Sequence, residues 1–291
     1  MKDINIFCFG FGQVAKNFIK KLNKENFNIK LTATSRNKTE KKKFDNINYT
    51  SFEFNESKFD SNINERVKNS DHILISIPPN NGKDIVFKNF SDVIKNANAK
   101  WITYLSATSV YGDHKGSWVT EKSDTRPLSS NGLNRLMAEK LWTSLFNENQ
   151  LSLQIFRLSG IYSNESNILV RLKSGKAKII NKENHFFSRV HVEDIANILF
   201  NSLFTFKPGE VFNVSDDMPA SSKEVTLFGA KILGIEKPKT IEVQNIENDM
   251  LKDFYRDSKK VSNKKMKDFF NYNLKFPTYV EGLNYIRNNF F

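Results

Sequence analysis

The stretch Gly10-Phe11-Gly12-Gln13-Val14-Ala15 constrains the fold more than any other part of the sequence, because it joins an apolar run to an amphipathic segment. In a G-x-G-x-x-A pattern the first glycine permits a tight turn, the second lets the backbone approach a pyrophosphate, and the alanine allows close helix packing. The amides that open the helix then face the anion. We therefore expect a dinucleotide-binding loop, with cofactor contacts at Gly10, Phe11, Gly12, Gln13 and Val14. A tight strand-to-helix turn without a ligand is the alternative.

Short apolar runs rich in β-branched and aromatic residues recur along the first part of the chain, and segments with helical spacing lie between them. Such alternation predicts an α/β fold with a parallel sheet whose strands are buried on both faces. We expect strands at 4–9, 29–33, 72–77, 101–105 and 153–158, and helices that begin at Val14, Ser91 and Asn134. After about residue 160 the alternation weakens, which indicates a smaller second lobe.

Composition narrows the class of protein. The length of 291 residues is ample for a well-buried core. Cys8 is the only cysteine, so the sequence predicts a small buried side chain rather than a disulfide or a cysteine-built metal site. The apolar N-terminal run is interrupted by Asn5 and does not resemble a signal peptide, and no run reaches the roughly 18 apolar residues of a membrane span. We therefore expect a cytoplasmic protein.

The net charge of +12 raises the question of a polyanionic partner. Lysine and asparagine are scattered over the whole chain together with many phenylalanines and isoleucines, and they form no focused stripe. We attribute the charge to compositional bias and do not expect nucleic acid as a partner.

The end of the second expected strand predicts which cofactor binds. An acidic residue there would hold the ribose 2′-hydroxyl of NAD. This chain instead has Thr34-Ser35-Arg36, and a hydroxyl beside a guanidinium suits a 2′-phosphate. Ser35 and Arg36 therefore favour NADP(H) over NAD(H), although Arg36 could also be a solvated loop cation.

Two prolines end the third expected strand abruptly, in Ser76-Ile77-Pro78-Pro79. The carboxyl ends of strands border the ligand crevice in a doubly wound sheet. Ile77 and Pro78 are therefore candidates for covering the cofactor, with a rigid connection as the equal alternative.

Longer motifs resemble a known family. The segments YLSATSVYGDHKGSWVTE (104–121), IFRLSGIYS, SRVHVEDIANIL (188–199) and EVFNVSDD (210–217) are similar to the extended short-chain dehydrogenase/reductases, the NAD-dependent epimerase/dehydratase proteins. The resemblance covers nearly the whole chain. It implies a Rossmann-type doubly wound parallel sheet with a smaller C-terminal substrate lobe. Residues 1–160, with a contribution from about 186–216, would form the NAD(P)-binding domain, and 161–291 mainly the smaller lobe.

The chemistry implied by this resemblance depends on three side chains: a Ser or Thr that binds the reacting oxygen, and a Tyr-x-x-x-Lys pair on one helix face. The matching positions here hold Ala107, Asn131 and Arg135. None of the three offers a group that titrates near neutral pH, although Arg135 could still bind ribose hydroxyls. The chain therefore resembles the atypical branch of the superfamily, whose members keep the cofactor loop and lose the pair.

Neighbouring residues could replace the missing groups. Ser109 and Tyr111 are the candidates for catalysis, although the tyrosine of a VYG motif in this family usually lines the substrate pocket or packs. His114 and Glu121 lie in a segment that could close over a substrate or remain a solvated loop.

In the second lobe, Arg189 and Arg256 are candidates for binding an anionic group of a substrate, because a guanidinium binds phosphate or carboxylate through two parallel hydrogen bonds. Each could also be a surface charge. His191 follows a family pattern that stabilises the lobe, and the four histidines show no metal-ligand spacing, so we expect no metal.

These observations favour an NAD(P)-dependent epimerase/dehydratase-like or reductase-like enzyme that acts on a small or nucleotide-linked carbonyl or alcohol substrate. A non-catalytic NADP(H) sensor or regulatory module is the alternative, because the catalytic pair is missing. Related proteins often pair through helices beside the active site, so a homodimer through the helix near Asn134 is a further expectation.

Overall fold

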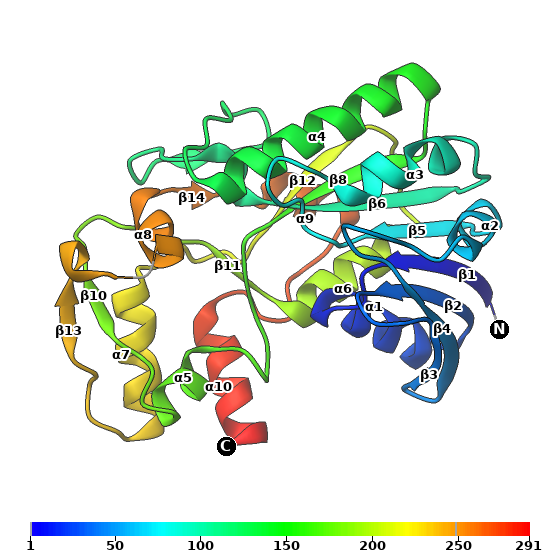
Figure 1. The fold of residues 1–291 in the computed structure, drawn as a ribbon. Coiled ribbons are helices and arrows are strands. Elements are labelled where there is room, and N and C mark those ends of the chain that lie inside the picture. The colour runs from blue at the N-terminus through cyan, green and yellow to red at the C-terminus, as the bar shows by residue number, and fades with distance from the viewer. Residues whose placement is uncertain (1, 248) are drawn as a thin grey trace. The chain divides into compact units, whose positions relative to one another are not determined.

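The computed structural model of the chain describes residues 2–247 and 249–291. It contains a mostly parallel eight-stranded sheet in the strand order β12-β8-β6-β5-β1-β2-β4-β3 (Figure 1). Its strands are β1 (Lys2–Phe9), β2 (Phe27–Ser35), β3 (Glu40–Phe44), β4 (Ile47–Glu53), β5 (His72–Ile75), β6 (Trp101–Ala107), β8 (Leu153–Leu158) and β12 (Val211–Val214). The expected Rossmann-type α/β fold is confirmed.

The remaining strands form three small parallel pairs. These are β9 (Gly160–Tyr162) with β11 (Arg189–His191), β10 (Ile179–Asn181) with β13 (Thr240–Glu242), and β7 (Trp118–Val119) with β14 (Lys260–Val261). The helices are α1 (Gln13–Lys24), α2 (Asn62–Lys68), α3 (Ile85–Lys95), α4 (Ser130–Asn149), α5 (Ile168–Lys173), α6 (Val192–Asn201), α7 (Ser222–Leu233), α8 (Asp249–Arg256), α9 (Lys264–Phe270) and α10 (Tyr279–Phe290), with 3₁₀ turns η1 (Thr108–Tyr111) and η2 (Val243–Asn245).

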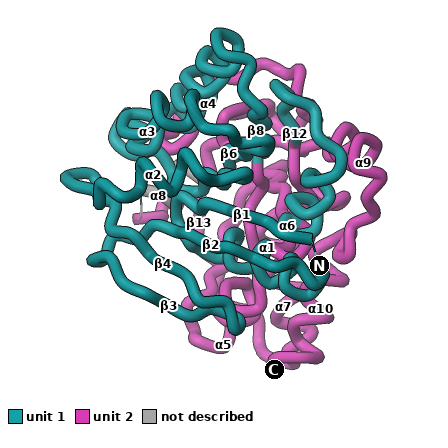
Figure 2. Tube along the Cα trace, turned by 90° about the vertical axis from the view of Figure 1, so that its right-hand side faces the viewer, with its two compact units in different colours: residues 1–107, 133–157, 195–212 teal, residues 108–132, 158–194, 213–291 magenta. Residues whose placement is uncertain are grey.

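The chain divides into two compact units, each built from three segments (Figure 2). Unit 1 contains residues up to 107 together with 133–157 and 195–212, and unit 2 contains 108–132, 158–194 and 213–291. The core of unit 1 consists of apolar side chains from the sheet and from helices α2, α3 and α4, among them Phe9, Ile75 and Trp142. The core of unit 2 joins α5, α7 and α10.

Local chemistry explains where the elements begin and end. The helix that we expected from Ser91 begins at Ile85, because the Asp84 carboxylate accepts hydrogen bonds from the backbone N–H groups of Val86 and Phe87 and caps the helix there. The antiparallel edge strand β3 was not expected, since its sequence EKKKF lacks an apolar alternation. Charged side chains on an edge strand are a common protection against pairing with other chains.

Two expectations from composition can be compared with the structure. Cys8 is fully buried, and burial raises the pKa of its thiol far above the usual range. Within the described part of the chain, no helix combines the length and the apolar character needed to cross a bilayer.

Candidate functional site

The glycine loop of unit 1 turns sharply after β1. Gly10 has a φ of +84°, and its N–H donates to Oγ1 of Thr34 at 2.9 Å, so the end of β2 holds the turn. A Cβ atom at Gly10 would lie 2.9 Å from Oγ of Ser76 and 3.0 Å from Cγ1 of Ile77. Position 10 therefore requires glycine for both its backbone conformation and its space.

Gly12, by contrast, faces open space. Its φ of −84° is accessible to any residue, and a Cβ built there meets no atom within 4 Å. No side chain of the described residues caps α1, so the first N–H groups of this helix remain available to an anion. The sequence assigned Gly12 the role of letting a pyrophosphate approach, and the geometry of the loop leaves room for one.

The strand ends around the loop supply further polar groups. Ser35 closes β2, and its buried Oγ has no hydrogen-bond partner among the described residues. A buried hydroxyl of this kind normally finds a partner. Arg36 follows it and is exposed.

The segment after β5 lies against the same loop. Oγ of Ser76 donates to the Phe9 carbonyl at 2.9 Å, Ile77 is half-buried and Pro78 is exposed. The backbone N–H of Gly82 donates to Oδ1 of Asn134 on α4 at 2.9 Å. The Phe11 ring packs against Phe44 and Tyr49, with centroid distances of 5.2 and 5.1 Å.

Helix α4 carries the positions of the missing pair. Asn131 is exposed, and Arg135 donates from Nη1 to the Leu105 carbonyl at the end of β6. One turn further on, the buried Glu139 accepts from Arg157 at 2.7 Å and from Oγ of Ser106 at 2.5 Å. Arg135 and Glu139 therefore bind α4 to the sheet. Neither supplies a group with the chemistry of the tyrosine.

In unit 2 the two candidates for catalysis, Ser109 and Tyr111, both lie in the turn η1. Tyr111 is fully buried and donates its hydroxyl hydrogen bond to Oδ1 of Asn213 at 2.7 Å. Ser109 is half-buried. Glu121 accepts from the Asn213 N–H at 2.8 Å, so Tyr111 and Glu121 bind the same residue.

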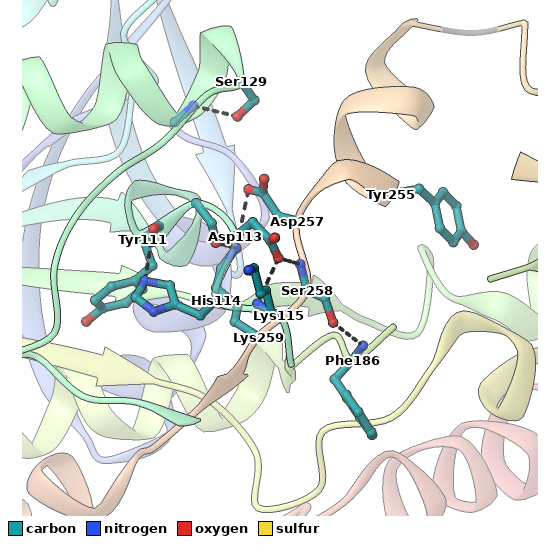
Figure 3. A network of polar contacts seen from close by, with 12 residues as sticks. Tyr111, Asp113, His114, Lys115, Ser129, Phe186, Tyr255, Asp257, Ser258 and Lys259 are labelled. Carbon is teal, nitrogen blue, oxygen red and sulfur yellow. Dashed lines mark hydrogen bonds and ion pairs between the residues drawn. The ribbon is translucent and has the colours of Figure 1, made fainter. Parts of the chain in front are cut away.

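A polar network joins the segment after Tyr111 to residues 257–259 (Figure 3). Ser258 donates from its N–H to Asp113 at 2.9 Å, and its carbonyl accepts from the N–H groups of His114 and Gly116. Lys259 donates to the Gly112 carbonyl at 2.9 Å and pairs with Asp257 at 3.4 Å. Burial lowers the pKa of Lys259. Sequence reasoning did not identify this network, because its partners lie about 145 residues apart along the chain.

Unit 2 also contains a cavity of about 550 Å³. Arg189 lines it and Arg256 does not. Arg171, Lys176 and Lys178 also line it, and the sequence gave no signal for them beyond their charge. The volume lies within the range of about 300 to 1,000 Å³ that is usual for small-molecule sites.

The RVHVED segment is a structural element of unit 2. His191 is fully buried, with ring centroids 5.0 Å from Tyr162 and 4.2 Å from Phe276. Burial lowers the pKa of His191 to about 4, so the ring is neutral near pH 7. The Asp194 carboxylate accepts from the Tyr272 hydroxyl at 2.7 Å and from the N–H groups of Lys275 and Phe276. The described residues contain no group of three or more side chains that could hold a metal ion.

A mostly parallel sheet with a glycine loop after its first strand defines the Rossmann class of α/β proteins. Residues 85–215 match the model of the NAD dependent epimerase/dehydratase family, so this part of the chain is similar to that family.

Among solved structures, a functionally unknown conserved protein from Silicibacter pomeroyi DSS is 30% identical over 99% of both chains, with a TM-score of 0.86. MoeE5 in complex with UDP-glucuronic acid and NAD is 18% identical over 96% of both chains, with a TM-score of 0.77. UDP-N-acetylglucosamine 4-epimerase from Bacillus cereus is 14% identical over 98% of both chains, with a TM-score of 0.74. At these last two identities the similarity is one of fold. A search of curated proteins finds no match.

Proposed function

We propose that this protein binds NADP(H) and acts as an epimerase/dehydratase-like or reductase-like enzyme without the Tyr-x-x-x-Lys pair of its family. The observation that carries the proposal is the open backbone at Gly12 beside the uncapped start of α1. There, Gly10, Phe11, Gly12, Gln13 and Val14 would hold the pyrophosphate. Ile77 and Pro78 would cover part of the cofactor, and Arg135 would bind ribose hydroxyls. A bound nicotinamide supplies hydride transfer, and the protein orients the reactants around it.

Calorimetric titration with NADPH, NADP, NADH and NAD tests this proposal. Gly12→Val should abolish binding, because its side chain would occupy the space of the pyrophosphate. The fold should tolerate it, since nothing in the protein lies within 4 Å of the new Cβ. No binding of any dinucleotide to a folded wild-type protein would overturn the proposal, as would Gly12→Val binding as tightly as wild type.

The preference for NADP(H) depends on Ser35 and Arg36. The unpartnered hydroxyl of Ser35 and the exposed guanidinium of Arg36 are both suited to a 2′-phosphate. MoeE5 and the UDP-glucuronic acid 4-epimerase of Bacillus cereus were solved with NAD, so this preference would distinguish the chain from them. Arg36→Ala should weaken NADPH binding roughly ten- to hundredfold and NADH binding little, because a hydrogen bond to a charged group contributes roughly 1.5 to 3 kcal/mol. Equal losses for the two cofactors would contradict the preference.

The substrate is proposed to be a small or nucleotide-linked carbonyl or alcohol compound, bound in unit 2. The cavity lined by Arg189 supports this, and several structural neighbours contain nucleotide sugars. Arg256 remains a second candidate for an anionic group. Arg256 does not line the cavity and Arg189 does, so the geometry supports Arg189 more strongly.

Tyr111 and Ser109 are proposed for proton transfer. Because the Tyr111 hydroxyl binds Asn213, loss of activity in Tyr111→Phe must be separated from loss of stability. Asn213→Ser removes the same hydrogen bond and keeps the phenol, so it is the matched control. A role in proton transfer predicts that Tyr111→Phe abolishes turnover of an identified substrate while Asn213→Ser retains it. Unchanged turnover in Tyr111→Phe would leave Ser109 as the candidate.

A non-catalytic NADP(H) sensor is the second candidate function. Helix α4 favours it, because the positions of the catalytic pair hold Asn131, which is exposed, and Arg135, which donates to the Leu105 carbonyl of the sheet. Turnover of any carbonyl compound with NADPH, lost in Gly12→Val, would exclude the sensor.

We also propose a homodimer through α4. Leu133, Met137 and Leu141 lie four residues apart on one face of this helix and are 44%, 51% and 41% exposed. A row of exposed apolar side chains on a helix is typical of an interaction surface.

A further inference from the structure

The walls of the cavity in unit 2 are mainly aromatic and aliphatic. Phe187, Tyr162 and Tyr279 line it together with the aliphatic side chains of Val225 and Leu283. Burial raises the pKa of the Tyr162 and Tyr279 phenols, so both rings are uncharged at neutral pH. Such a surface binds the apolar part of a ligand rather than a strongly hydrated group.

Four polar side chains of the lining, those of Asn167, Ser222, Thr226 and Tyr255, make hydrogen bonds within the protein. The Asn167 side chain accepts from the N–H groups of residues 169 and 170 and donates to the carbonyls of residues 163 and 164. Oγ1 of Thr226 donates to the Ser222 carbonyl at 2.7 Å, and the Ser222 side chain is hydrogen-bonded to the Tyr255 phenol. The Tyr162 hydroxyl is buried without a hydrogen-bond partner among the described residues, so it remains available to a ligand together with the cations of the lining.

The charged groups of the lining all have one sign. Arg171, Lys176, Lys178 and Arg189 line the cavity, and no carboxylate does among the residues whose side chains are described. Lys176 and Lys178 alternate with the buried Ala177 and Ile179, so this extended segment directs its cations to the cavity.

Two of the cations affect the same ionisable group, the phenol of Tyr255. Arg171 and Arg189 both lower the pKa of Tyr255 by their charge, against the larger rise due to burial. Of the three guanidinium nitrogens of Arg189, only Nη1 makes a hydrogen bond to a described residue, to the carbonyls of Phe187 and Ala220 at 2.9 Å. The negative charge of Asp216 would also raise the pKa of Arg189. Burial raises the pKa of Asp216 itself to about 8, however, so this carboxyl group is mostly protonated near neutral pH.

We propose that this cavity binds an organic acid with an apolar body, a carboxylate or a phosphate monoester, whose acidic group lies between Arg171 and Arg189. This deepens the proposed function, because it names the class of substrate. Only the claim that the bound acid is a substrate rests on the proposed function. Binding of the acid itself depends on unit 2.

The probe is the fluorescent aromatic anion 8-anilinonaphthalene-1-sulfonate, titrated into the full-length protein. Octanoate, octyl phosphate, 1-octanol and UDP-glucose then compete with it. The two acids should displace the probe at concentrations at least tenfold lower than 1-octanol or UDP-glucose, and their relative order distinguishes a carboxylate from a phosphate.

Arg171→Met should weaken binding of the better acid about tenfold, or about 1.4 kcal/mol. Arg171 is exposed, so its replacement should not prevent folding. Arg287→Met, which changes an exposed arginine of α10 outside the cavity, is the matched control and should have no effect. Lys178→Met is a second variant and should act in the same direction as Arg171→Met.

Three results would overturn the inference: no binding of the probe, displacement by 1-octanol or UDP-glucose at equal or lower concentration than by the acids, or equal effects of Arg171→Met and Arg287→Met. Calorimetry with NADPH on the same preparation separates the two proposals. Binding of the acid without NADPH binding would contradict the proposed function alone, and NADPH binding without acid binding would contradict this inference alone.

Discussion

At the scale of single residues, the two glycines of the loop have opposite requirements. The first is fixed by its positive φ and by Ser76 and Ile77, and the second has space around it. The sequence pattern predicted the tight turn at Gly10, and the pyrophosphate contact at Gly12 stays a prediction. The pattern could not show that Thr34 and Ser76 hold the turn, because these contacts join strands that are 24 and 66 residues away from Gly10.

Gly10→Ala should destabilise the protein by about 1 to 3 kcal/mol, because it combines a strained φ with a close contact to Ser76. Gly82→Ala is the matched control, since Gly82 has a φ of +72° and no atom within 4 Å of a new Cβ. Urea unfolding measures both. A loss in Gly10→Ala no larger than in Gly82→Ala would show that the contact with Ser76 is unimportant.

Asp216 makes the stability depend on pH. The pKa of Asp216 in the folded protein is about 8, above its usual value of 3.8. Between about pH 4 and 8 the folded protein therefore keeps a proton on Asp216 that the unfolded chain has lost. Stability from this group is therefore full at low pH and is lost as the pH rises towards 8. The positive charge of Arg189 lowers the pKa of Asp216, and the negative charge of Asp217 raises it.

Asp216→Asn should remove this loss. Between pH 5 and 8, the free energy of unfolding should fall by at least about 1.4 kcal/mol more in wild type than in Asp216→Asn. Asp124→Asn, at an exposed position, should behave as wild type. Identical pH profiles of wild type and Asp216→Asn would mean that Asp216 titrates normally.

At the scale of elements, the buried strands of the sheet were easier to predict than the partly exposed elements. Strand β8 was predicted with its observed bounds, and β1, β2 and β6 were extended by only a few residues, because runs buried on both faces are apolar throughout. The edge strand β3 and helix α2 were missed, since partly exposed elements have a weak apolar pattern. The cavity and the Ser258 network were not predictable, because each depends on contacts between segments far apart in the chain.

Helix α4 supplies a prediction at this scale. Arg157→Met would leave the Glu139 carboxylate buried without its partner, and we expect a loss of about 3 to 5 kcal/mol in chemical unfolding. The double variant Glu139→Gln, Arg157→Met should recover most of this loss, because the glutamine can still accept from Ser106. If the double variant is as unstable as Arg157→Met, the cost comes from lost packing rather than from an unpaired charge.

At the scale of the whole molecule, the proposed homodimer can be tested through the exposed face of α4. Met137→Glu should convert a dimer into a monomer in light scattering, because it places a charge in the row formed with Leu133 and Leu141. Leu227→Glu changes a 36% exposed leucine of α7 and should leave the mass unchanged. A wild-type monomer at all concentrations would refute the dimer.

The interleaving of the two units has a consequence for synthesis on the ribosome. The sheet of unit 1 receives β8 and β12 only after the intervening segments of unit 2 have been made. Translation at about 5 to 20 residues per second needs roughly 5 to 20 seconds to pass from the end of β6 to residue 212. During that interval first the edge of β6 and then the edge of β8 lacks its neighbouring strand. We therefore expect the nascent chain to depend on chaperones before it is released.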